Sequence, residues 1–329
     1  MLEFFALFVL GVFLLVKSSD LFVVSASRLA KIFGVSELVI GLTVVAIGTS
    51  LPEFAASVMA SLAGNPEIAT GNVIGSNIAN LALILGVSAI FHNLKIEKSL
   101  FQRECYILLG VTFLFYIMAL DKTISFADGL VLIFLFFLYL FFMFKFKVQF
   151  HEVFKVRLYI EHLLSFRKFL RMFEQNFKKI FVSEAMVLLI SLLGLYFGAE
   201  FMVNSASNIA KLFSLSDTFI GATLVSLGTS LPELAVALVS LKKGFHNMLI
   251  GNIVGSNIIN ILFVGGFAAL VNSLPVLDFT LFVLGPFLII VSAIFLLFAW
   301  SDLTIKRPEG IVLFLLYILF LIMILPHGA

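Results

Sequence analysis

The chain is organised around the stretch Gly48-Thr49-Ser50-Leu51-Pro52-Glu53, which is followed by Gly71-Asn72-Val73-Ile74-Gly75-Ser76-Asn77-Ile78-Ala79-Asn80. Both pieces recur further along, as Gly228-Thr229-Ser230-Leu231-Pro232-Glu233 and Gly251-Asn252-Ile253-Val254-Gly255-Ser256-Asn257-Ile258-Ile259-Asn260. Residues 41–81 align with residues 221–261 without a gap and share 18 identities. Chance does not produce such a match, so we interpret the chain as an internal duplication.

The composition indicates a membrane protein that crosses the bilayer many times. Of the 329 residues, 62% are hydrophobic and only 12% are charged. This leaves too little polar surface to cover a soluble fold, and an apolar run of about 20 residues spans a bilayer as a helix. We therefore predict an all-α polytopic protein with ten transmembrane helices, near residues 4–30, 37–62, 68–91, 103–120, 127–144, 182–210, 217–241, 247–271, 279–299 and 310–325.

The two copies divide the chain into two five-helix repeats. We expect a first repeat over 1–144, a linker over 145–180 and a second repeat over 181–329. Because five is odd, the second copy enters the membrane upside down relative to the first. Inverted repeats are typical of transporters, whose sites lie near the midplane where the repeats meet. The alternative is that duplication merely builds a larger helical bundle, but the best-matched residues are polar ones that packing does not require.

The lysines and arginines predict the orientation. If both termini lie outside, segments on the cytoplasmic side hold 18 of the 21 basic residues, as the positive-inside rule favours. We therefore expect a multi-pass protein of the cell membrane, the inner membrane where there are two, with both ends outside. The 145–180 linker carries nine of these basic residues and reads as an amphipathic helix on the anionic inner leaflet. A regulatory or partner-binding role for this linker stays open.

Pro52 and Pro232 predict a break in the second and seventh spans. Proline has no amide hydrogen for the carbonyl four residues back, and its ring crowds the same turn. Carbonyl groups freed at membrane depth are tolerated only where they line a cavity or meet a ligand. Each proline precedes a glutamate, Glu53 or Glu233, and an ionisable group inside a membrane helix indicates a functional site.

The third and eighth spans carry a polar ribbon each. Asn72, Ser76 and Asn80 step by four residues and so share one helix face. The eighth span repeats the pattern, with Asn252, Ser256 and Asn260. We interpret these ribbons as the wall opposite the two acids. Hydrogen bonding between packed helices is the alternative reading, above all for Asn72 and Asn252.

These residues form an all-oxygen environment with two negative charges, which suits a hard cation. One Ca²⁺ would neutralise both carboxylates, and smaller monovalent ions could use the same oxygens. The single cysteine, Cys105, and the five histidines show no spacing typical of a soft-metal site. No HExxH, GxSxG or other nucleophile-base motif is present, so we expect no enzymatic activity, no cofactor and no nucleic-acid partner.

The two GTSLPE blocks, each followed by a GN-x-x-GSN block, resemble the paired repeat motifs of the sodium/calcium exchanger family, within the calcium/cation antiporter superfamily, in its short microbial form. The resemblance covers both halves and implies exchange of Na⁺ for Ca²⁺ by alternating access, with the two ions as substrates. By position it implies twelve ion ligands, with main-chain carbonyls at the first residue of each set: Ala46, Thr49, Ser50, Glu53, Ser76 and Asn80, and Ser226, Thr229, Ser230, Glu233, Ser256 and Asn260.

Two other functions stay open at this point. One keeps the antiporter class but couples calcium to H⁺ or K⁺. Some family members, including potassium-dependent ones, have Asp where this chain has Asn260, and the GN-x-x-E signature of proton-coupled exchangers is in neither half. The other function is a cation channel. We expect the protein to act as a monomer in contact with membrane lipid.

Overall fold

The computed structural model describes residues 2–33, 35–147, 181–205, 208 and 226–324. The described chain is mostly helical, with eight helices long and apolar enough to cross a membrane, or nine if one bent pair counts as a single span. This agrees with the predicted all-α membrane protein. The predicted seventh span, 217–241, is described only from residue 226, and most of the 145–180 linker lies outside the described residues.

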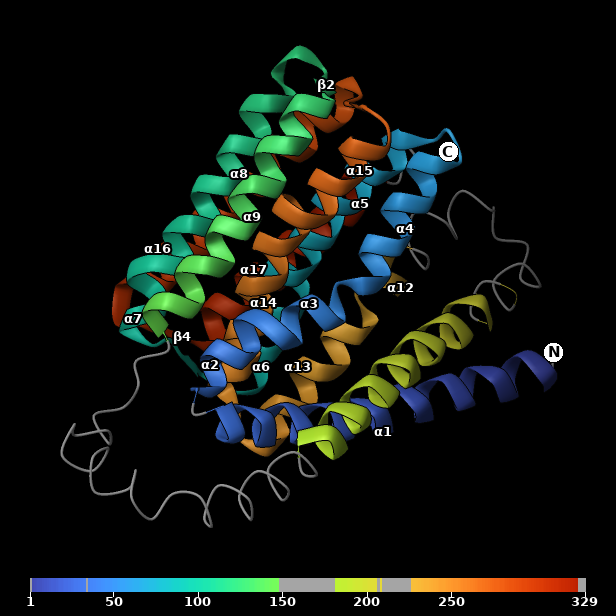
Figure 1. Cartoon of the computed structure of the whole chain (residues 1–329), viewed down its shortest axis with the longest axis vertical. Helices are drawn as coiled ribbons and strands as arrows, with labels where there is room; N and C mark the ends of the chain where they lie inside the picture. Colours follow the sequence, from blue (N-terminus) through green and yellow to red (C-terminus); the bar gives the residue numbers. More distant parts are fainter. Residues whose placement is uncertain (1, 34, 148–180, 206–207, 209–225, 325–329) are drawn as a thin grey trace, which may run out of the picture.

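The first half contains four continuous candidate membrane spans and one bent pair of helices. They follow one another through short connections (Figure 1). Its elements are α1 (Leu2–Phe33), α2 (Glu37–Ile40), η1 (Gly41–Val45), α3 (Ala46–Thr49), α4 (Leu51–Leu62), α5 (Pro66–Ile78), η2 (Ala79–Ile84), α6 (Leu85–Phe91), β1 (Leu94–Lys95), α7 (Lys98–Leu100), η3 (Phe101–Cys105), α8 (Tyr106–Met118), η4 (Ala119–Asp121), β2 (Thr123–Ile124) and α9 (Phe126–Lys147).

The described part of the second half follows a similar order. It begins with the Phe181–Ser205 helix, and the described elements after it are α12 (Ser226–Thr229), α13 (Leu231–Lys243), α14 (His246–Ile259), η6 (Asn260–Gly265), α15 (Gly266–Val271), β3 (Leu274–Pro275), η7 (Thr280–Leu284), α16 (Gly285–Asp302), β4 (Thr304–Ile305) and α17 (Arg307–Ile324).

Two helical rods form the centre of the bundle. The spans Pro66–Phe91 and His246–Val271 are 78% and 83% buried, whereas the other candidate spans are 22–44% buried. Each rod contains a π-helical segment whose first turn holds the last residue of its polar ribbon. Segment η2 begins at Ala79, next to Asn80, and η6 begins at Asn260 itself. A π-turn adds a residue to the turn and is frequent at functional sites. The remaining spans surround these rods and expose apolar side chains, as a lipid environment permits.

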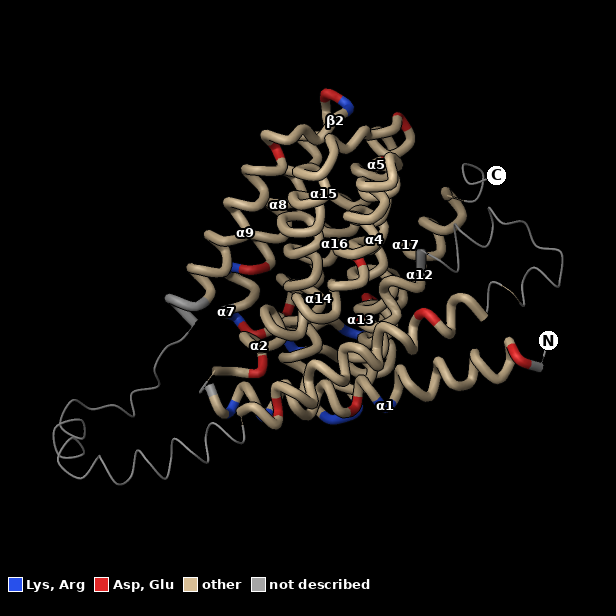
Figure 2. Tube along the Cα trace, turned by 45° about the vertical axis from the view of Figure 1, so that its right-hand side comes forward, with Lys and Arg blue, Asp and Glu red and all other residues tan. Residues whose placement is uncertain are grey.

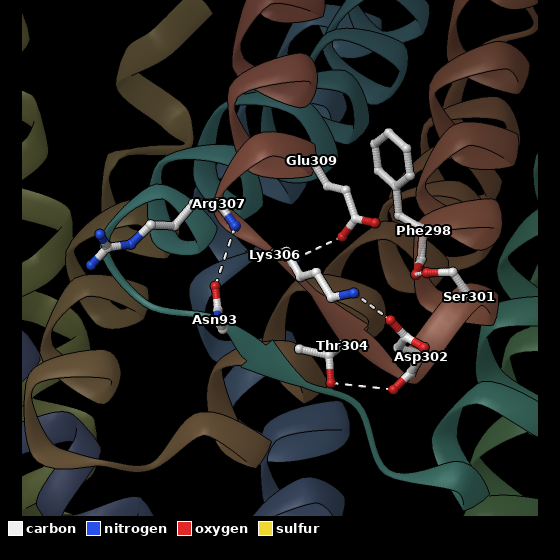
Figure 3. A network of polar contacts seen from close by, with 8 residues as sticks. All are labelled: Asn93, Phe298, Ser301, Asp302, Thr304, Lys306, Arg307 and Glu309. Carbon is white, nitrogen blue, oxygen red and sulfur yellow. Dashed lines mark hydrogen bonds and ion pairs between the residues drawn. The ribbon is translucent and has the colours of Figure 1, made fainter.

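Two short ladders join the loops of one half to the loops of the other. Strand β1 pairs with β4 through Leu94 and Ile305, and β2 pairs with β3 through Ile124 and Leu274. The two ladders lie at opposite ends of the bundle (Figure 1). At the β4 end, Asn93 accepts a hydrogen bond from the amide of Arg307, and Lys306 pairs with Asp302 (Figure 3). This ion pair raises the pKa of the exposed Lys306.

Helix α1 and the Phe181–Ser205 helix lie side by side across the rest of the bundle (Figure 1). Their backbones touch at Gly11 and Gly198, since a Cβ added to Gly11 would lie 2.8 Å from the Gly198 carbonyl oxygen. The pair Lys243–Asp20, 2.8 Å apart, ties α1 to the end of α13. Charged residues are otherwise concentrated toward the ends of the helices, and few lie within the bundle (Figure 2).

Candidate cation-binding site

Both predicted helix breaks are present. Helix α3 ends at Thr49 and α4 begins at Leu51, with a bend of 41° between the helical segments on either side. The linking residue, Ser50, has φ −83° and ψ 4°, and its counterpart Ser230 has φ −90° and ψ 3°. Pro52 and Pro232 occupy the first turn of the helix that follows. Each proline stops the preceding helix, because it has no amide hydrogen to continue the backbone hydrogen bonds. It also suits the first turn of the next helix, where that hydrogen is not needed.

The two acids meet at these breaks. Glu53 lies in the first turn of α4 and Glu233 in the first turn of α13, and their side chains are 1% and 0% exposed. A helix N-terminus carries partial positive charge, which favours a carboxylate in this position. The Ser230 hydroxyl donates to Glu53 Oε1 at 3.4 Å. A residue of the second break thus binds the acid of the first.

The hydroxyl groups around the acids are arranged reciprocally. Thr229 and Ser230 lie beside the Glu53 carboxyl group, and Thr49 and Ser50 lie beside that of Glu233. These residues come from positions almost 180 apart in the chain. The tertiary structure therefore brings the two GTSLPE blocks together into one site.

The polar ribbon of α14 forms one wall of this site. The Thr49 hydroxyl donates to Asn252 Oδ1 at 3.2 Å and lies 3.5 Å from Ser256 Oγ. Ser256 Oγ in turn donates to the Ala46 carbonyl oxygen at 3.5 Å. Ala46, the residue predicted to present a main-chain carbonyl, is therefore beside a predicted hydroxyl ligand of the other half.

Glycines allow α14 to approach so closely. A Cβ added to Gly251 would lie 2.7 Å from the Leu38 carbonyl oxygen, and one added to Gly255 would lie 2.8 Å from that of Leu42. Real Cβ atoms do not come this near, so backbone packs directly on backbone here. The small-xxx-small spacing of these glycines is typical of close helix contacts in membranes.

The polar ribbon of α5 forms the other wall. Asn72 donates through Nδ2 to the Glu53 carbonyl oxygen at 3.1 Å, and its Oδ1 accepts from the Ser76 hydroxyl at 3.4 Å. Asn80 and Asn260 are both buried where the π-helical segments begin. Ser226 is the first residue of α12, and its side chain lies outside the described part of the structure.

Several predicted ligands carry side-chain oxygens that are buried and have no hydrogen-bond partner. Buried polar atoms are normally paired, so a group of unpaired oxygens needs an explanation. A hard cation suits these atoms because its preferred ligands are carboxylate, hydroxyl and amide oxygens. Within the described residues they are Ser50 Oγ, Glu53 Oε2, Asn80 Oδ1, Thr229 Oγ1, both Glu233 carboxylate oxygens and Asn260 Oδ1.

A pair of cavities beside α4 reaches Thr229 of the site. One, of about 350 Å³, extends from Thr229 past Glu200 and Asn204, and the other, of about 340 Å³, extends from Thr229 along Asn72 and Ser76. Their walls include Met59 and Ile68, which are 63% and 56% exposed. The cavities thus connect the site with the surface near the connection between α4 and α5.

The sequence pattern predicts that Asn72 and Asn252 lie on the wall of the site and outside the ligand set. In the structure each forms a hydrogen bond with a predicted ligand residue, and the four-residue step to Ser76 and to Ser256 was the signal in the sequence. Ser57 was missed. It accepts a hydrogen bond from Asn72 Nδ2 at 2.9 Å, but it is not repeated in the second half, so the internal repeat gave no sign of its role.

A family profile described as sodium/calcium exchanger protein matches residues 3–145 and 183–325, and so covers most of both halves. The sodium/calcium exchanger MaX1 of Methanosarcina acetivorans is 36% identical over 342 residues, which cover 97% of this chain and 98% of that protein. An uncharacterized membrane protein of Methanocaldococcus jannaschii, MJ0091, is 38% identical over 95% of each chain.

Solved structures of the sodium-calcium exchanger NCX_Mj share this fold. The form soaked with 2.5 mM Na⁺ and 0.1 mM Ca²⁺ superimposes with a TM-score of 0.81 at 35% identity, over 97% of both chains. The form soaked without either ion gives 0.82 over 97% of this chain and 98% of the other.

Proposed function

The chain belongs to the sodium/calcium exchanger family, and from this premise we propose that it exchanges Na⁺ for Ca²⁺ across a membrane. The observation that carries the proposal is the burial of Glu53 and Glu233, two acids from different halves, together with the hydrogen bond that Ser230, three residues before Glu233, donates to Glu53. A pair of carboxylates lined by hydroxyl and amide oxygens binds a divalent hard cation and can bind Na⁺ through the same atoms. Exchange requires that Na⁺ and Ca²⁺ compete for one set of ligands.

The proposed ligands are the twelve residues predicted from sequence. Eight of them lie together around the two acids, and unpaired oxygens of Asn80 and Asn260 add to the donor set. The eight are Ala46, Thr49, Ser50, Glu53, Thr229, Ser230, Glu233 and Ser256. The site has two fixed charges, so one Ca²⁺ neutralises it. Removal of either carboxylate would leave a divalent ion with an uncompensated charge in a buried place, which is costly.

We propose that the protein has ten spans in two inverted five-helix repeats that alternate access to the site. The matched order of elements supports this, as do the paired breaks. The two ladders offer further support, because each joins a first-half loop to a second-half loop and they lie at opposite ends of the bundle. An inverted repeat relates the two ends of the molecule in this way.

The proposed location is the cell membrane, with both termini outside. The basic residues Lys95 and Arg307 then lie at the cytoplasmic end, and the α4–α5 connection lies outside. In this orientation the cavities beside α4 lead to the outer surface. Because both halves of the site come from one chain, a monomer surrounded by lipid suffices for transport.

Calcium transport in proteoliposomes tests the proposed function. Vesicles loaded with Na⁺ should take up Ca²⁺ only when external Na⁺ is lower, and neither a pH gradient nor K⁺ should replace the sodium gradient. Glu53→Gln and Glu233→Gln should each abolish uptake, since the amide keeps the size and removes half of the site's charge. Glu67→Gln, the same change in the first turn of α5 and outside the site, should retain it.

The same vesicles separate the rival functions. Uptake driven by a pH gradient would indicate H⁺ coupling, and calcium entry without any counter-gradient, with single-channel currents, would indicate a channel. Robust sodium-driven exchange in either glutamine variant would overturn the proposed role of the acids.

A further inference from the structure

Asn72 and Asn252 occupy matched positions in the two halves and contact the site without belonging to the proposed ligand set. Asn72 uses its whole amide group. Its Nδ2 donates to the Glu53 carbonyl oxygen at 3.1 Å and to Ser57 Oγ at 2.9 Å, and its Oδ1 accepts from the Ser76 hydroxyl at 3.4 Å. One side chain thus connects the acid-bearing turn of α4 with a hydroxyl of α5.

Among the described residues, Asn252 forms one hydrogen bond, and unlike those of Asn72 it crosses the interface between the halves. Its Oδ1 accepts from the Thr49 hydroxyl at 3.2 Å, while its Nδ2 has no partner among the described residues. The side chain is fully buried, so its amide does not form hydrogen bonds with water at the molecular surface. The effect of Asn252 on the site therefore depends on its hydrogen bond with Thr49.

A hydroxyl group has one proton and two lone pairs, and only the lone pairs bind a cation. When the proton is donated to an amide oxygen, it cannot point at the ion, and the lone pairs are left for coordination. Asn72 holds the proton of Ser76 in this way, and Asn252 holds that of Thr49. Both hydroxyls belong to the ligand set of the proposed exchange.

We propose that Asn72 and Asn252 are positioning residues that orient the Ser76 and Thr49 hydroxyls so that their lone pairs face the bound ion. This inference rests on the proposed function. Asn72 has a second task, because its bond to the Glu53 carbonyl oxygen fixes the first turn of α4 against α5. The two halves thus differ at positions where their motifs are identical.

The difference has a local cause. Ser57, which accepts the second Nδ2 hydrogen of Asn72, has Ala237 as its counterpart in the second half. Without a hydroxyl there, Asn252 Nδ2 lacks the equivalent acceptor. Asn252 is therefore specialised for accepting from Thr49, whereas Asn72 both donates and accepts.

Binding of Ca²⁺ to purified protein in detergent tests the inference with two variants at each position. Leucine removes the amide at similar size, and aspartate keeps the acceptor oxygen but removes the donors. We expect Asn252→Leu to weaken Ca²⁺ binding about fivefold to tenfold, the effect of losing one hydrogen bond that orders a ligand. Asn252→Asp should bind at least as tightly as the unaltered protein, since it still accepts from Thr49.

Asn72 should respond differently because it also donates. Both Asn72→Leu and Asn72→Asp should weaken binding, the leucine variant more, since only aspartate still accepts from Ser76. In transport assays the loss should fall mainly on the calcium concentration for half-maximal rate rather than on the maximal rate. Asn93→Leu replaces an exposed amide beside the β1–β4 ladder, away from the site, and is the control for the substitution itself.

The outcomes separate this inference from the proposed function. If the unaltered protein binds no Ca²⁺, the proposed function fails. If it binds Ca²⁺ and Asn252→Leu binds equally well, the positioning role is wrong. An equal loss in Asn252→Leu and Asn252→Asp would also overturn it, because the amide hydrogens rather than the acceptor oxygen would then matter. Unfolding temperatures without ion identify any variant whose loss is only a folding defect.

Discussion

The hydroxyl of Ser230 donates to the carboxylate of Glu53 at 3.4 Å, although 177 residues separate them in the chain. Each residue lies where a proline interrupts a helix, so two breaks that are distant in sequence face each other inside the bundle. We expect Ser230→Ala to keep the fold and to weaken Ca²⁺ binding by about tenfold to hundredfold, because a hydrogen bond to a charged group is lost along with an oxygen ligand. Calorimetric titration of the purified protein measures the change, and unaltered affinity would contradict it.

The topology predicts which loops an impermeant thiol reagent reaches. In a Cys105→Ser background, Asn65→Cys should react from outside intact cells and Lys95→Cys only after the membrane is opened. Both positions are exposed, whereas Cys105 is buried, so accessibility depends on the side of the membrane. Reaction of Lys95→Cys in intact cells would reverse the proposed orientation.

Asn260 predicts exchange without potassium. Its side chain is buried and neutral, and neither of its polar atoms has a partner among the described residues. It therefore adds no charge for a further monovalent ion to a site already committed to two carboxylates. Sodium-driven calcium flux should be the same in potassium-free and potassium-containing buffers. A strict requirement for K⁺ would show that this determinant lies elsewhere.

The transport cycle should move charge. One Ca²⁺ neutralises Glu53 and Glu233, and two Na⁺ would do the same, but hydroxyl pairs lie beside both acids and can hold a third Na⁺. Three Na⁺ per Ca²⁺ carry one net positive charge in the direction of sodium. In proteoliposomes clamped with valinomycin, an inside-negative potential should speed sodium entry coupled to calcium exit and slow the reverse exchange. Rates that ignore voltage in both directions would indicate two Na⁺ per Ca²⁺.

Gly251 and Gly71 occupy the same place in the repeated motif but should respond differently to alanine. A Cβ on Gly251 would lie 2.7 Å from the Leu38 carbonyl oxygen, so Gly251→Ala forces two backbones apart at a cost of about 1–3 kcal/mol. Gly71 has no described atom within 4 Å of the same added Cβ, and alanine favours the helix there by about 0.5–1 kcal/mol. Thermal unfolding in detergent should therefore show a lower midpoint for Gly251→Ala only. Equal midpoints would contradict this difference.

The sequence by itself determined the membrane class, the helix breaks and the two acids. Apolar runs of bilayer length leave few alternatives to helices, and a proline inside a helix removes a backbone hydrogen bond and favours a kink or break. The repeat also predicted that both halves contribute to one site. These conclusions depend on composition and on chemistry between residues close together in the chain, and both can be read from the sequence.

Only the tertiary structure decided how identical motifs differ. It packs α14 against α2, η1 and α3 through Gly251 and Gly255, while Gly71 lines a cavity. It also gives Asn72 three hydrogen bonds and Asn252 one, and pairs Asp20 with Lys243 rather than with the nearby Lys17. Two copies of one motif share local propensities, but their neighbours come from different parts of the chain. Contacts between distant segments therefore decide what each copy can do.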